Sequence, residues 1–254
     1  MLEEFVSLNV FSVLLVFARL GSAFMLLPGF GESYVGPRVR LFLAFAVSLA
    51  VLPVVGEDLP PMPADVLSTA LLVLAEILIG LFIGGAVRLI TTALHIAGQI
   101  MALQSALAAA QFFDPNQGTG GSMHGSFLSM LGIVLIFATN LHHPMLWALV
   151  DSYALFAPGA PPPLADFAEI TTRMAADAFR IAFQLAAPIV IVTLLVNVST
   201  GLIARLIPQI QIFFIALPLQ IGVGFLILGI TLSAVMLWYL EHVEAGLLPF
   251  LVGR

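Results

Sequence analysis

The sequence predicts an all-α membrane protein with about six hydrophobic segments. Of its 254 residues, 61% are hydrophobic and only 9% are charged, and the mean hydropathy is +1.14. Apolar runs such as 66–90 and 210–240 are long enough to cross a bilayer core, which takes about 20 residues of helix. A water-soluble domain of this size would have no place to bury so much apolar surface.

The candidate spans are separated by turn-rich or proline-rich links. The second span is short, and Pro188 and Pro218 lie inside the last two, where a proline should kink the helix because it lacks an N–H group. The six candidate spans are 5–27, 41–55, 66–90, 126–150, 183–203 and 210–240.

The arginines near the span ends predict an orientation. The side with more of them should face the cytoplasm. This places both termini on the periplasmic side if all six segments cross. The two sets are Arg38, Arg40, Arg88 and Arg205 on the cytoplasmic side against Arg173, Arg180 and Arg254 on the other.

The composition argues against several functions. The net charge is −6 and all eight cations are arginine, so no basic patch is present for nucleic acid. A P-loop needs a lysine, and this chain has none. It also has no cysteine, and its histidines lack the spacing of a zinc protease. We therefore expect no enzyme activity, no cofactor and no metal site.

Two charges inside predicted spans need an explanation. Arg19 and Glu76 would each cost about 2.5–3.5 kcal/mol in hydrocarbon even on lenient insertion scales. At 1.5 Å per helical residue, an extended arginine could reach the carboxylate. We expect a structural pair that fixes how two helices dock, and an ion-translocation pair is the alternative.

Small residues predict close helix packing. Gly80 and Gly84 form a GxxxG face on the third span, which lets two backbones approach. The following segment, 91–111, carries Thr92, His95 and Gln99 on one helical face. We expect this segment to pack among protein helices.

A glycine-rich stretch, 112–125, separates this segment from the fourth span. Irregular backbone at membrane depth is tolerated where protein buries it or where it lines a water-filled cavity. We expect a re-entrant or pore-closing loop, and an ordinary exposed loop is the alternative. The residues assigned to this plug loop are Phe112, Phe113, Asp114, Pro115, Gln117, Gly118, Thr119, Gly120, Gly121, Ser122, Met123 and His124.

An ordered set of motifs resembles the FliR family, the R subunit of the bacterial flagellar export gate, which has relatives in virulence type III secretion. The motifs run from about residue 14 to 240 and include "FARLGSAFMLLPGFGESYVGPRVRL", "EILIGLFIGGAVRLI", "QFFDPNQGT" and "LIARLIPQI". The last of these, with Arg205, Pro208 and Gln209, is assigned to helix packing.

The resemblance implies a non-enzymatic subunit of a protein-export channel in the bacterial inner membrane, within the flagellar basal body. One R subunit would join P and Q subunits in a helical gate for unfolded proteins, with the B subunit at the cytoplasmic entrance and lipid around it. Stretch 112–125 would help to plug the closed channel. The chain would be one membrane domain, 1–254, with helices in 1–111 and 126–254 on either side of the plug.

Family members assemble as bent helical hairpins lifted largely above the membrane plane, so the hydropathy spans describe insertion potential. The competing interpretation is a secondary transporter or small-solute channel, which would also use helices broken by glycine and proline.

Overall fold

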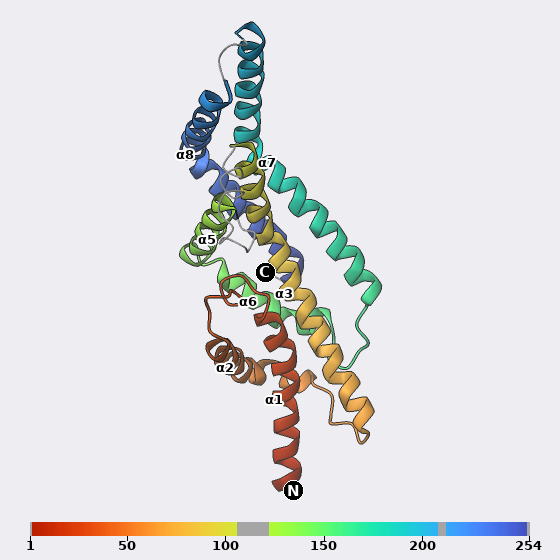
Figure 1. The fold of residues 1–254 in the computed structure, drawn as a ribbon. Coiled ribbons are helices and arrows are strands. Elements are labelled where there is room, and N and C mark those ends of the chain that lie inside the picture. The colour runs from red at the N-terminus through yellow and green to blue at the C-terminus, as the bar shows by residue number, and fades with distance from the viewer. Residues whose placement is uncertain (1, 106–121, 208–211, 253–254) are drawn as a thin grey trace. The chain divides into compact units, whose positions relative to one another are not determined.

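The computed structural model describes residues 2–105, 122–207 and 212–252, and within these ranges it contains helices and no strand (Figure 1). Four of these helices are long and apolar enough to cross a membrane. The prediction of an all-α membrane protein is confirmed. The chain divides into two compact units, which are described separately below.

Unit 1 comprises Met1–Ile90, Ile136–Ala175 and Val243–Arg254. It contains α1 (Leu2–Phe24), α2 (Pro37–Val55), the short 3-10 helix η1 (Gly56–Asp58), α6 (His142–Leu155) and the 3-10 helix η2 (Leu248–Phe250). The first part of α3 (Val66–Gln104) also belongs to it.

Aromatic rings from all three chain segments of unit 1 pack against one another. Phe82 of α3 stacks on Phe167 with a ring separation of 3.9 Å, and it meets Phe156 and Phe250 edge-on at 6.0 and 6.2 Å. Such pairs add to the stability gained from apolar burial. The cluster therefore fixes the C-terminal 3-10 helix to the core of unit 1.

Unit 2 comprises Thr91–Leu135 and Ala176–His242. It holds the second part of α3, most of α5 (Met123–Ala138), and most of α7 (Leu164–Leu206) and α8 (Ile212–Leu247). Gly132 of α5 lies against Leu94 and Tyr239, where an added Cβ would stand 2.6 and 3.1 Å from their side chains. The small residue thus lets α5 approach α3 and α8.

The fourth predicted span, 126–150, is not one helix. α5 ends at Ala138 and α6 begins at His142, so the segment is a broken span. Asn140 between them has a φ of 61°, a left-handed conformation in which asparagine is several-fold enriched. The broken span lowers the number of unbroken crossings that hydropathy alone would count.

Three helices are longer than one bilayer crossing needs. α3 has 39 residues, α7 has 43 and α8 has 36, and at about 1.5 Å per residue even α8 measures about 54 Å along its axis. The hydrocarbon core of a bilayer is about 30 Å thick. The apolar span predicted at 66–90 and the first part of the helix expected over 91–111 form one continuous helix, which the structure describes up to Gln104.

Candidate functional site

Arg19 of α1 and Glu76 of α3 meet inside unit 1. The Arg19 Nε donates a hydrogen bond to Glu76 Oε2 at 2.6 Å, and neither side chain has any exposed surface. A buried ion pair adds little net stability, because the cost of desolvating the two charges opposes their attraction. Loss of one partner is nevertheless strongly destabilising, because it leaves the other charge buried and unpaired.

The end of α6 supplies the remaining partners of Arg19. One terminal nitrogen donates to the Ser152 backbone carbonyl at 3.1 Å and lies 3.3 Å from the Ser152 hydroxyl. The other donates to the Phe156 carbonyl at 3.1 Å. These carbonyls lie at the negative end of the α6 dipole, which favours a cation. Arg19 therefore joins three helices, α1, α3 and α6.

Sequence reasoning missed the α6 partners of this cluster. A signal was present, because a guanidinium carries five N–H donors and one carboxylate cannot accept them all. The Arg19 guanidinium also lies 4.0 Å from the centre of the Tyr153 ring. Two buried oxygens in the cluster, Glu76 Oε1 and the Tyr153 hydroxyl, have no hydrogen-bond partner among the described residues.

The GxxxG face of α3 lies against α1 beside this cluster. A Cβ added at Gly80 would overlap the Arg19 carbonyl and the Ser22 hydroxyl, and one at Gly84 would stand 2.7 Å from the Ala23 carbonyl oxygen. Only glycine fits such an approach of two backbones. The glycines thus allow the short distance at which Arg19 and Glu76 pair.

Two further arginines fasten the link between α1 and α2. Arg40 donates to the backbone carbonyls of Phe30, Glu32 and Val35 at 3.1, 2.8 and 3.4 Å. Arg88 of α3 forms an ion pair with the Glu32 carboxylate. Both arginines belong to the set that the orientation rule places at the cytoplasm, and here they also shape a loop.

Most of the predicted plug loop lies outside the described residues: Phe112, Phe113, Asp114, Pro115, Gln117, Gly118, Thr119, Gly120 and Gly121. The assignment of Met123 and His124 to a loop is wrong, because both belong to the first turn of α5. Ser122 precedes that turn and its hydroxyl accepts a hydrogen bond from the Gly125 amide at 2.9 Å. Ser122 is therefore the N-cap of α5.

The start of α5 packs tightly on α3 within unit 2. A Cβ added at Gly98 would overlap the backbone of Gly125. One turn earlier on α3, the His95 ring nitrogens lie 3.4 Å from the Ser129 hydroxyl and 2.9 Å from the Gln99 side-chain nitrogen. His95, which the sequence places on the polar face of 91–111, thus contacts α5.

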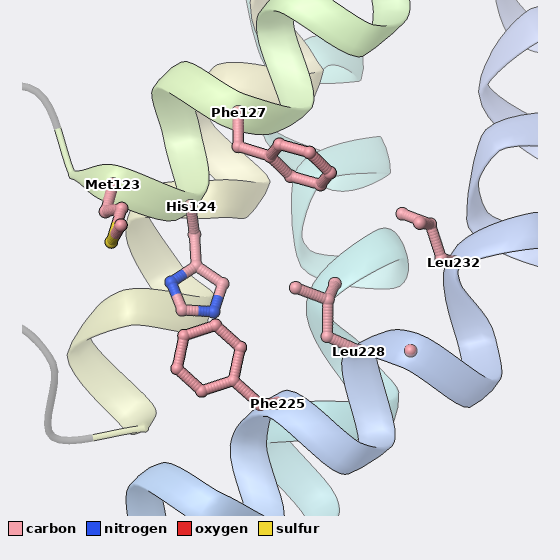
Figure 2. A pocket seen from close by; sticks show the side chains of 7 residues that line it. Met123, His124, Phe127, Phe225, Leu228 and Leu232 are labelled. Carbon is pink, nitrogen blue, oxygen red and sulfur yellow. The ribbon is translucent and has the colours of Figure 1, made fainter.

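A cavity of about 320 Å³ lies between α5 and α8 (Figure 2). The His124 ring stacks on Phe225 with a ring separation of 5.3 Å. His124 is 3% exposed, and neither ring nitrogen has a hydrogen-bond partner among the described residues. Sequence reasoning did not find this site, because nothing in the sequence shows that residues 124 and 225 meet.

The packing role predicted for Arg205, Pro208 and Gln209 is not tested by the structure. Arg205 is exposed near the end of α7, and Pro208 and Gln209 lie outside the described residues. Within the part of the chain that the structure describes, no group of three or more metal-ligating side chains occurs.

Comparison with known proteins identifies the family. The family model described as bacterial export proteins, family 1, matches residues 10–246. The flagellar biosynthetic protein FliR of Caulobacter vibrioides is 38% identical over 231 residues, which cover 91% of this chain and 92% of the relative. The chain belongs to the FliR family of bacterial export proteins.

Other members of the FliR family are more distant but similarly long. FliR of Bacillus subtilis is 32% identical over 225 residues, covering 87% of this chain and 86% of the relative. FliR of Escherichia coli is 31% identical over 199 residues, covering 78% and 75%. The match spans both compact units and includes the Arg19 cluster and the α5–α8 cavity.

Proposed function

We propose that this protein is a non-enzymatic subunit of the flagellar protein-export gate in the bacterial inner membrane. It would form, with P and Q subunits, the channel through which unfolded flagellar proteins leave the cell, with the B subunit at the cytoplasmic entrance. The observation that carries this proposal is the family match over residues 10–246, together with the three relatives above, each of which is named a flagellar biosynthetic protein.

The chemistry of the described residues supports a scaffold. The buried charges of Arg19 and Glu76 neutralise each other, and the guanidinium is further held by carbonyls of α6. Among the described residues, Arg19 bonds to Glu76 and to the α6 residues Ser152 and Phe156, and this set is not a row of titratable side chains of the kind that a proton relay needs. We therefore assign this cluster to helix docking, which a channel subunit requires in order to hold its shape.

The apolar surface supports assembly. Large apolar side chains are exposed along α7 and α8, among them Phe183, Leu195, Leu202, Leu226 and Ile230. Lipid or partner helices must cover such surface. Helices longer than a bilayer crossing leave part of it above the hydrocarbon, where protein partners are the suitable cover.

The glycine-rich stretch 112–122, which precedes α5, is proposed to help close the pore. Its three glycines, Gly118, Gly120 and Gly121, permit tight backbone turns. Phe112 and Phe113 at its start and Phe127 beyond its end offer apolar bulk for a seal. This role rests on the sequence and on the family resemblance.

The experiment is a deletion of the gene in its own host, complemented by a tagged copy. Loss of flagellin from the culture medium, with flagellin still made in the cell, is the expected result. The tagged chain should also co-purify with the other export subunits from mild detergent. A deletion strain that secretes flagellin normally, or a chain that purifies alone and monodisperse, would contradict the proposal.

A further inference from the structure

The segment 246–252 comprises the end of α8, the 3-10 helix η2 and two further residues, and it belongs to unit 1. We refer to it as the clasp segment. Leu247 and Phe250 are 1% and 6% exposed, and a Cβ added at Gly246 would stand 2.7 Å from the end of the Ile90 side chain. The clasp segment is therefore packed into unit 1 and is not a tail on its surface.

The clasp segment contacts α3 through an aromatic ring. The Phe250 ring meets the Phe82 ring edge-on at 6.2 Å. Phe82 also meets the ring of Phe156, the residue that follows the last turn of α6, at 6.0 Å. On α3, Phe82 lies within two turns of Glu76. The apolar anchor of the clasp segment is thus close to the Arg19 cluster.

The clasp segment contacts α6 through a hydrogen bond. The Val252 backbone amide donates to Asp151 Oδ2 at 3.0 Å. Asp151 lies directly before Ser152, whose backbone carbonyl accepts from Arg19 at 3.1 Å. The clasp segment therefore contacts the same two helices, α3 and α6, that Arg19 joins to α1.

Asp151 is an unfavourable residue for its position in α6. The C-terminal end of a helix is the negative end of its dipole, so an acidic side chain there is destabilising. Aspartate is also a poorer helix former than alanine. The helix alone therefore does not account for this carboxylate. The Val252 amide does, because a hydrogen bond to an ionised acceptor is stronger than one between neutral groups.

α6 is short and depends on support from the rest of unit 1. It has 14 residues, and isolated helices of this length are marginal in water, so most of their stability in a protein comes from tertiary packing. It begins just after the turn at Asn140 and ends at the proline-rich link 156–163. Neither flanking segment continues the helix, so the contacts of α6 with unit 1 must hold it in place.

We propose that the clasp segment is a conformational lock that holds α6 against α3 and so keeps the Ser152 and Phe156 carbonyls in place for Arg19. The Phe250 ring is its apolar anchor on α3, and the Val252 amide is its polar anchor on α6. All of these residues belong to unit 1. The lock goes beyond the proposed function and does not depend on it, because it requires no other protein.

Truncation is the principal test. A stop after Leu248 removes both anchors, whereas a stop after Val252 removes only residues 253 and 254 and is the matched control. The measurement is hydrogen–deuterium exchange of the chain, purified in mild detergent with whatever subunits accompany it. After the first truncation, the α6 amides should exchange at least about tenfold faster, which corresponds to about 1.4 kcal/mol in the free energy of local opening.

The control truncation should leave the exchange of α6 unchanged. Peptides from 215–240 of α8 should exchange as in the parent in both truncations, which shows that unit 2 remains folded. Equal exchange of α6 in the two truncations, whether fast or slow, would overturn the proposal.

Asp151→Ala distinguishes the lock from a plain surface charge. If the carboxylate were only solvated, alanine would improve the end of α6 and its amides would exchange more slowly. The lock predicts the opposite, an exchange that is severalfold faster. Asp151→Asn keeps an oxygen that can accept from the Val252 amide and should recover most of the loss. Glu57→Ala removes an exposed carboxylate elsewhere in unit 1 and should not change α6.

Slower exchange in Asp151→Ala, or no recovery in Asp151→Asn, would show that the hydrogen bond does not hold α6. These variants keep the whole clasp segment, so they decide the question even if the shorter truncation fails to fold.

Cross-linking tests the lock in the membrane. The chain has no cysteine, so Asp151→Cys combined with Val252→Cys provides two thiols that a short bifunctional thiol reagent should join within one chain. When Phe250→Ala is added, α6 should exchange faster, and the cross-link should return its exchange toward the parent rate. A pair of cysteines that does not cross-link in native membranes, or a cross-linked chain whose α6 still exchanges fast, would overturn the proposal.

Discussion

Arg19 and Glu76 lie 57 residues apart in sequence, and their side chains meet at 2.6 Å with no surface exposed. Removing one partner leaves the other as an unpaired buried charge, which costs about 3–5 kcal/mol. Arg19→Met and Glu76→Met should therefore each reduce the amount of assembled complex sharply and lower its thermal midpoint in detergent. The double variant should be more stable than either single one.

The α6 contacts sharpen this prediction. Exchanging the two charges should restore little, because a carboxylate at position 19 would face the carbonyls of Ser152 and Phe156 that now accept from the guanidinium. Arg173→Ala is the control: its ion pair with Glu169 is 75% and 61% exposed, and such pairs contribute about 1 kcal/mol or less. Equal losses at positions 19 and 173 would contradict the cluster's role.

Gly80→Ala should loosen the contact between α1 and α3. The new Cβ would overlap the Arg19 carbonyl and the Ser22 hydroxyl, and overpacking of this kind costs about 1–3 kcal/mol. Gly85→Ala, five residues along the same helix, is the control, because its Cβ would have one neighbour, Leu26, at 3.7 Å. Thermal unfolding of the two complexes, followed by loss of soluble assembly, makes the comparison. An equal midpoint for both variants would show that α1 and α3 can separate freely.

Arg40→Ala should release the link between α1 and α2. The guanidinium donates to three backbone carbonyls of that link, so its loss should raise the rate of limited proteolysis within residues 25–36. Arg38→Ala removes the same charge from the same first turn of α2, but Arg38 is exposed, and it should leave the rate unchanged. If both variants are cut at the same rate, the hydrogen bonds of Arg40 do not protect the link from proteolysis, and the prediction is wrong.

Deleting residues 117–121 should make the inner membrane leak small ions while the complex still assembles. This deletion retains Ser122, whose hydroxyl caps α5, so the helix should begin where it does now. Ser122→Ala is the control: loss of the cap costs about 1 kcal/mol of stability and should cause no leak. Small-solute influx at equal levels of complex is the measurement. A deletion strain as tight as its parent would show that the stretch only connects two helices.

The sequence predicted the class of the fold because composition alone decides it. A chain that is 61% hydrophobic and 9% charged must place helices in or beside a membrane. Hydropathy did not show that 126–150 is broken at Asn140, because a window long enough to detect a span averages the few polar residues there, Thr139, Asn140, His142 and His143, with the apolar residues on either side. Hydropathy alone ends the third span at Ile90, whereas the small and polar residues beyond it predicted a further helix packed among protein helices, and α3 does continue to Gln104.

The residues of the candidate sites were also predictable from the sequence only in part. Arg19 and Glu76 stood out because charges inside apolar runs are rare. Ser152 and Phe156 contribute backbone carbonyls, which carry no sequence signal, so their part in the cluster required coordinates. His124 appeared to belong to a loop because the glycines before it obscure the start of α5, and its contact with Phe225 joins segments about a hundred residues apart.

The Arg19 cluster also constrains how the protein is made. Along the chain, Glu76 follows Arg19 by 57 residues and Ser152 follows it by 133. Arg19 therefore leaves the ribosome well before either partner does. At about 5–20 residues per second, the carboxylate arrives roughly 3–11 s after the arginine, and the α6 carbonyls arrive later still. During that interval α1 carries an unpaired cation in a largely apolar helix, so the insertion machinery must retain it until α3 emerges. Slowing translation between residues 19 and 76 should therefore increase degradation of the nascent chain.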